Sequence, residues 1–277
     1  MLSGLFAYEF MINAFIAATV VALVAGPVGF FLVLRQQSFA GHALSHVGFT
    51  GATGAVLLGL PPLWGLVALT LLAGLAMGLL GEKVAGRDVA IGLVLAASLG
   101  LGLLFLHFFT AYAAQATALL FGNVFGVDRR TLLTLAVLGV VTLAGLAAIA
   151  RPLLFASLQP ELAEARGVPV RLVSVLFLGL VALATAGCAQ IIGVLLVFTL
   201  MVGPAATAQR LTRGLGTGLA LAAGLALAEA WGGIVLAYAT DWPASFWITA
   251  LSGVSYLLSG LALVRLRRPE PDPLPAR

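Results

Sequence analysis

Long hydrophobic runs separated by short polar segments make up most of the 277-residue chain. Six runs contain no Asp, Glu, Lys or Arg, and they cover residues 10–34, 43–81, 89–127, 131–150, 172–209 and 242–264. A seventh run, 214–240, is interrupted by Glu229 alone. A helix of about 20 apolar residues crosses the hydrocarbon core of a bilayer. The pattern therefore predicts an all-α fold, a polytopic membrane helix bundle.

Two of these runs are long enough for two transmembrane helices each. Run 43–81 contains Pro61-Pro62, which favours a hairpin, and run 172–209 has a weaker break at residues 187–190. Run 89–127 predicts one span followed by a less regular segment, 110–127, which could form a short re-entrant or interfacial helix. The total is nine crossings, or eight if residues 191–209 turn back at Pro204.

The composition supports one membrane domain. Hydrophobic residues make up 62% of the chain and charged residues 9%, whereas a soluble domain carries about 25% charged residues. We therefore expect a single transmembrane domain over residues 1–268. The proline-rich segment 269–277 is predicted to be a disordered cytoplasmic tail.

The basic residues lie mainly between the hydrophobic runs. With nine crossings, 12 of the 14 Lys and Arg residues fall in the odd-numbered loops or the tail, and only Arg129 and Arg130 fall in the even-numbered loops. Basic residues concentrate on the cytoplasmic side of membrane proteins. The distribution predicts an external N-terminus and a cytoplasmic C-terminus. It also accounts for the net charge of +4 by membrane orientation, so we do not expect nucleic-acid binding.

A polar stripe marks the second predicted helix. Residues three or four apart share a helix face, and the stripe comprises Ser38, His42, Ser45, His46, Thr50 and Thr53. The spacing of His42 and His46 lets both imidazoles reach one ion, and neutral imidazole binds zinc and other transition metals. The alternative is two histidines hydrogen-bonded to neighbouring helices. We predict that the pair binds a passing metal ion, with Ser45 and Thr50 along the same pathway.

Three further polar residues are weaker pathway candidates. Glu229 is the only acid within a run, and it fits either a metal or proton group in a water-filled path or a carboxyl held inside the bundle. Gln190 lies within run 172–209. His107 lies near the outer end of the fourth span, where an interfacial position is favoured over a metal-binding one.

The loop segment 157–168 predicts a short helix between two spans. Pro160 suits the first helical position, and Gly167 suits the position after the helix end. Glu161 and Glu164 precede Arg166, which is the order that the helix dipole favours. The helix is either an ordinary connector or a docking element for a cytoplasmic partner.

Several enzymatic sites are absent from the sequence. The nucleotide-binding P-loop requires Gly-x-x-x-x-Gly-Lys-Ser/Thr, and the only lysine, Lys83, lies in Gly81-Glu82-Lys83-Val84. ATP hydrolysis by that route would have to come from another subunit. An intramembrane hydrolase ranks last, because the chain contains neither His-Glu-x-x-His nor Gly-x-Ser-Gly. We expect a transport subunit, with no enzymatic activity and no permanently bound cofactor.

Three segments together resemble the permease subunits of bacterial zinc/manganese ABC importers. Residues 40–46 (Ala-Gly-His-Ala-Leu-Ser-His) are similar to the family's Gly-Asp-Ala-Ile/Leu-Ser-His, and residues 119–124 (Leu-Leu-Phe-Gly-Asn-Val) to its Leu-Leu-Phe-Gly-Asn/Ser. The third segment runs from residues 160–163 through 167–168 and 193–197 to 204–208. His46 takes the family's histidine position, whereas His42 replaces its usual aspartate.

The resemblance implies a type II ABC importer-like permease in the bacterial plasma (inner) membrane. It implies a homodimer, ATP-binding cassette subunits beneath it and an extracytoplasmic metal-binding protein above it, with the 157–168 helix as the coupling helix. The cargo would be a divalent transition metal. A His–His pair without a carboxylate favours zinc, with manganese and iron as alternatives. The rival hypothesis is a proton-coupled secondary metal transporter that uses Glu229.

Overall fold

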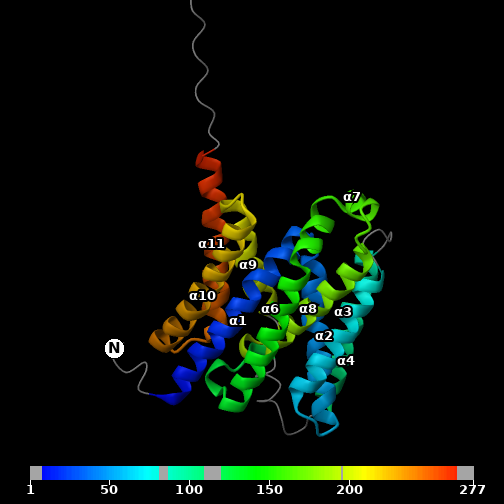
Figure 1. The fold of residues 1–277 in the computed structure, drawn as a ribbon. Coiled ribbons are helices and arrows are strands. Elements are labelled where there is room, and N and C mark those ends of the chain that lie inside the picture. The colour runs from blue at the N-terminus through cyan, green and yellow to red at the C-terminus, as the bar shows by residue number, and fades with distance from the viewer. Residues whose placement is uncertain (1–7, 81–86, 109–119, 195, 267–277) are drawn as a thin grey trace, which may run out of the picture.

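The chain folds into a bundle of long helices, as predicted (Figure 1). The computed structural model describes residues 8–80, 87–108, 120–194 and 196–266. Within these residues the long helices are α1 (Glu9–Leu34), α2 (Ser38–Leu57), α3 (Pro62–Leu80), α4 (Arg87–His107), α6 (Arg129–Leu158), α8 (Val170–Ile192), α9 (Val197–Leu211), α10 (Leu215–Thr240) and α11 (Ala244–Leu266). Two shorter elements are η2 (Val124–Gly126) and α7 (Pro160–Ala165).

Seven of these helices are long and apolar enough to cross a membrane, namely α1, α3, α4, α6, α8, α10 and α11. The other two long helices are α2, which contains the histidines and hydroxyls of the polar stripe, and α9, which has only 15 residues. Nine long helices in the described part of the chain agree with the eight to nine predicted crossings. Helix α2 therefore differs from the other long helices by its polar stripe, and helix α9 differs by its short length.

The hairpin at Pro61-Pro62 is confirmed, because α2 ends at Leu57 and α3 begins at Pro62. The predicted break at residues 187–190 is wrong, since α8 continues to Ile192. A glycine inside a helix costs only about 1 kcal/mol, and close packing of the buried α8 offsets that cost. Helix α9 also passes through Pro204 without turning back, as membrane helices tolerate.

The chain leaves α8 at Gly193, whose φ of 80° lies in the left-handed region. Gly122, in the segment that precedes η2, has the same φ value. The backbones of the two glycines lie in close contact. A Cβ atom on either one would collide with the backbone of the other segment. Glycine is the residue that accepts both this conformation and this approach, so the break occurs three residues beyond the expected one.

Helices α1 and α8 lie at the centre of the bundle. Figure 1 shows α9, α10 and α11 on one side of them and α2, α3 and α4 on the other. Helix α1 packs against α9, α10 and α6, while α8 packs against α3 and α6, and α2 lies against α3 and α4. Gly51 and Gly65 let α2 and α3 approach so closely that a Cβ on either would collide with the other's carbonyl. Small residues support such contacts in membrane bundles.

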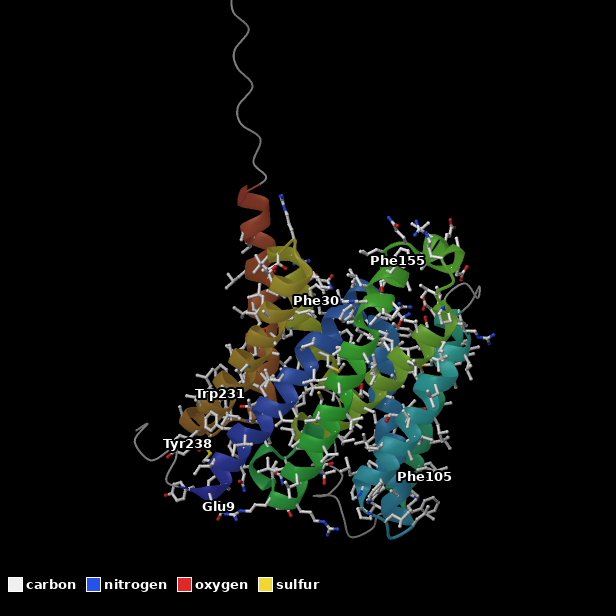
Figure 2. All side chains as sticks on the ribbon, viewed as in Figure 1. Glu9, Phe30, Phe105, Phe155, Trp231 and Tyr238 are labelled. Atoms are coloured by element: carbon white, nitrogen blue, oxygen red, sulfur yellow. The ribbon has the colours of Figure 1, made fainter. Side chains whose placement is uncertain are left out.

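Acidic and basic side chains lie close together at the end of the bundle where α1 and α6 begin. At one end Arg129 donates to Glu9 with 2.8 Å between Nη2 and Oε1, and Asp128 caps α6 by accepting from the backbone of Thr131. Hydrogen bonding from Thr131, together with the charge of Arg130, lowers the pKa of Asp128. The two arginines that depart from the predicted charge pattern are thus each matched with an acid. Figure 2 places Glu9 at this end and Phe155, near α7, at the other.

Some sequence predictions fall outside the described residues. These are the tail 269–277, Lys83 and most of the segment 110–127. The described end of that segment contains the single 3-10 turn η2.

Candidate functional site

His42 and His46 meet edge to face on successive turns of α2. Their ring centroids are 4.8 Å apart and their planes lie at 88°. His46 is buried, His42 is half-buried, and Nδ1 of His42 is buried with no hydrogen-bond partner among the described residues. Metal–nitrogen bonds are about 2.0–2.1 Å long, so rings this close can share one ion when an in-plane nitrogen of each points towards it. The structure thus brings the two predicted ligands together.

Phe198 of α9 packs against His42. Its ring lies edge to face with that of His42, with 5.2 Å between centroids. Phe198 belongs to the first turn of α9, directly after the irregular stretch that follows Gly193. Sequence reasoning missed this residue, because a phenylalanine within a hydrophobic run carries no signal of its own.

The hydroxyls of the polar stripe bond to nearby backbone. Ser45 donates to the carbonyl of Gly41 at 3.3 Å, and Thr53 donates to that of Phe49 at 2.9 Å. Thr50 donates to the carbonyl of Ser98 on α4. These bonds satisfy the hydroxyl protons in a buried setting. A pathway role for Ser45 and Thr50 stays a prediction that would use their remaining oxygen lone pairs.

Glu229 lies in a separate polar cluster between α10 and α11. Its side chain is 4% exposed and accepts a hydrogen bond of 2.8 Å from Ser255. Ser252, one turn away, donates to the carbonyl of Thr199 at 3.4 Å. Because Thr199 follows Phe198, the first turn of α9 lies between this cluster and the histidines. The recurrence of Ser252, Ser255 and Ser259 in the last span was the sequence signal that could have revealed the cluster.

The two remaining candidates lie away from the histidine pair. His107 is exposed at the end of α4, with its ring 5.8 Å from that of Phe108. Helix α4 already passes α2 at Thr50, so His107 lies about two turns further along. Gln190 is half-buried near the end of α8. No described interaction joins either residue to the pair, and the interfacial position of His107 stays a prediction.

The histidine pair alone does not complete a metal site. No group of three or more His, Cys, Asp or Glu side chains able to hold a metal occurs among the described residues. Structural zinc sites use four ligands. A divalent ion at this pair would therefore need further ligands of another kind, beyond the His, Cys, Asp and Glu side chains of the described residues.

Helix α7 is a short, exposed helix that connects α6 to α8 (Figure 1). Pro160 is its first residue, and Gly167 has a φ of 80° while Val168 donates to the carbonyl of Ala163 at 2.9 Å. The predicted start and end of this helix are confirmed. Its exposed side chains are those of Glu161, Leu162, Glu164 and Arg166. They present a compact mixed surface beyond the apolar bundle.

Known proteins share this sequence and fold. Residues 7–262 match the model of the ABC 3 transport family. The chain is 31% identical over 238 residues to the manganese transport system membrane protein MntC of Halalkalibacterium halodurans, which covers 86% of this chain and 82% of that protein. It is 29% identical over 262 residues to the manganese import system permease protein ScaB of Streptococcus parasanguinis, covering 93% and 92%.

A solved structure extends the likeness to three dimensions. PsaBC from Streptococcus pneumoniae in complex with Fab contains a chain that superposes with a TM-score of 0.84 at 28% identity. The match covers 93% of both chains. The family match over residues 7–262 and the structural match over 93% of the chain therefore agree over nearly the whole length.

Proposed function

Because this chain belongs to the ABC 3 transport family and is the permease subunit of a metal ABC transporter, we propose that it passes a divalent transition metal ion along α2, at His42 and His46. The observation that carries the proposal is the edge-to-face pair of imidazoles, 4.8 Å apart between centroids. In a bundle with so few ionisable side chains, such a pair is a candidate functional site.

We propose zinc as the preferred ion. The relatives MntC and ScaB are named for manganese, and the motif that residues 40–46 resemble implies an aspartate at the position of His42 in such permeases. Manganese prefers oxygen ligands, whereas imidazole suits zinc. Replacing a carboxylate by a second imidazole thus shifts the site towards zinc. A second copy of the chain would add another pair, giving the four ligands that zinc favours.

The ATP-binding cassette subunit would dock on α7 through its exposed surface. A metal-binding protein would deliver the ion at the opposite end of the bundle, where Glu9 pairs with Arg129. This arrangement places the N-terminus outside the plasma membrane and the C-terminus in the cytoplasm. The basic residues near α7, among them Arg166 and Arg171, support the orientation.

Transport would then follow alternating access. The ion leaves the metal-binding protein, exchanges water for the imidazoles of His42 and His46, and is released towards the cytoplasm. ATP binding and hydrolysis in the partner subunit would change the arrangement of the helices around α2. Proton coupling through Glu229 is the less supported route, because Glu229 bonds to Ser255 on the far side of α9.

The test measures zinc uptake by proteoliposomes that contain the permease, its ATP-binding subunit and the metal-binding protein. The double variant His42→Ala/His46→Ala should lose most ATP-dependent uptake while still assembling with the ATP-binding subunit. The control is His107→Ala, which removes the exposed third histidine. Uptake by the double variant at the parental rate would exclude the proposed path.

A further inference from the structure

Arg35 joins three helix ends at the α7 end of the bundle. It follows the last residue of α1, and its Nη1 donates to Ser157 Oγ of α6 at 3.2 Å. Its Nη2 donates to Ser174 Oγ of α8 at 2.7 Å. The guanidinium also lies 5.6 Å from the ring centroid of Phe177. An arginine that contributed only its positive charge to membrane orientation would need none of these contacts.

The two serines belong to the helices that hold α7. Ser157 lies near the end of α6, two residues before Gln159, which precedes α7. Ser174 lies in the second turn of α8, which follows α7 after residues 166–169. Arg35 therefore bonds to both attachments of the exposed helix. A planar guanidinium with several fixed donors suits this bridge better than a lysine ammonium.

On its other side Arg35 is tied to α2. Only residues 35–37 separate α1 from α2. Gln36 has a φ of 55°, and the backbone of Gln37 donates to the carbonyl of Leu32 at 2.9 Å. Gln37 is 4% exposed. The turn is thus tightly packed, and His42 follows one turn into α2. The Arg35 contacts therefore connect the base of α7 to the start of α2, in addition to the packing of α8 against α2 and α3.

We propose that Arg35 is the positioning residue that transmits movement of α7 to the helix with the histidine pair, and that it sets the amount of metal moved per ATP hydrolysed. The inference rests on the proposed function, since it takes α7 as the docking site and α2 as the metal path. The inference adds Arg35, which belongs neither to the docking surface on α7 nor to the histidine pair on α2. Arg35 acts through Ser157 and Ser174 and touches neither ATP nor metal.

The experiment measures zinc uptake and ATP hydrolysis in the same proteoliposomes containing the full complex. Arg35→Lys keeps the charge but loses the forked geometry, and the double variant Ser157→Ala/Ser174→Ala removes the acceptors. Arg35→Lys should lower the ratio of zinc moved to ATP hydrolysed by about tenfold, as expected for the loss of one charge-assisted hydrogen bond. The double serine variant removes two such bonds and should lower the ratio by at least as much. The triple variant should be no worse than the double one, because both changes remove the same contacts.

Arg210→Lys is the matched control. Arg210 also bonds to another helix, through Tyr256, but it lies on α9 away from α7. The ratio of zinc moved to ATP hydrolysed should therefore stay at the parental value in Arg210→Lys. A parental ratio in Arg35→Lys would overturn the inference. Loss of uptake together with loss of the bound ATP-binding subunit would also overturn it, because the role would then be structural. The proposed function fails separately, if the histidine double variant transports zinc normally.

Discussion

His42 packs against Phe198 with 5.2 Å between the ring centroids and 72° between the ring planes. The contact joins α2, which has the histidine pair, to the first turn of α9. That turn starts just after the left-handed Gly193 and continues to Thr199, whose carbonyl accepts from Ser252. The histidine pair, the break after α8 and the Glu229 cluster therefore meet at one short stretch of chain.

Phe198→Leu should weaken transport without abolishing it. Leucine keeps an apolar side chain but removes the ring contact that fixes the His42 imidazole. An aromatic pair contributes about 0.5–1.5 kcal/mol, so the zinc concentration for half-maximal uptake should rise about two- to tenfold. Phe246→Leu is the control, since Phe246 is an exposed aromatic on α11. An unchanged concentration would show that Phe198 does not orient His42.

His42→Asp should change the preferred metal. The substitution returns a carboxylate to the position and gives manganese an oxygen ligand. In uptake assays with both ions present, the ratio of zinc to manganese should fall by about tenfold, equivalent to about 1.4 kcal/mol. His107→Asp places the same carboxylate at an exposed site and should leave the ratio unchanged. If His42→Asp keeps the parental ratio, the choice of metal is made elsewhere.

Glu229→Gln should leave ATP-dependent uptake close to the parental level. The amide oxygen can still accept the hydrogen bond from Ser255, and no titratable proton is needed in an ATP-driven mechanism. Glu229→Leu removes that acceptor, while the Ser255 hydroxyl keeps its bond to the carbonyl of Ser252 at 2.9 Å. Stability should therefore fall by about 0.5–1.5 kcal/mol, measured as thermal unfolding of the purified complex. Loss of uptake in Glu229→Gln, with assembly intact, would favour the proton-coupled alternative.

Local rules of sequence predicted the parts of the fold that depend on single elements. Pro160 and Gly167 delimit α7 as expected, and Pro61-Pro62 separates α2 from α3. The break at 187–190 was misplaced, because burial keeps α8 helical through Gly187. Gly193 ends the helix owing to its approach to Gly122, and such a contact between distant segments leaves no trace in one local pattern.

The candidate site was predictable only in part for the same reason. The spacing of His42 and His46 indicates that they share a helix face, and the rings do meet. Phe198 and Arg35 gain their roles from partners on other helices, which spacing within one helix cannot reveal. Ser255 could have been linked to Glu229, because both are polar residues in adjacent spans.

The orientation can be tested with single cysteines. The native Cys188 is 1% exposed, so a membrane-impermeant thiol reagent should not reach it. Thr131→Cys, at the Glu9 end, should react in intact cells, and Ala165→Cys, in α7, should react only in inverted membrane vesicles. The reverse pattern would place the N-terminus in the cytoplasm and contradict the proposed orientation.

The central claim is that zinc binds directly to His42 and His46. The measurement is zinc K-edge X-ray absorption of the purified permease bound to its ATP-binding subunit, after loading with zinc in the absence of the metal-binding protein. We expect imidazole scattering around the zinc at bond lengths of about 2.0–2.1 Å, and its loss in His42→Ala/His46→Ala. The same imidazole signal in the parental complex and the double variant would contradict the account.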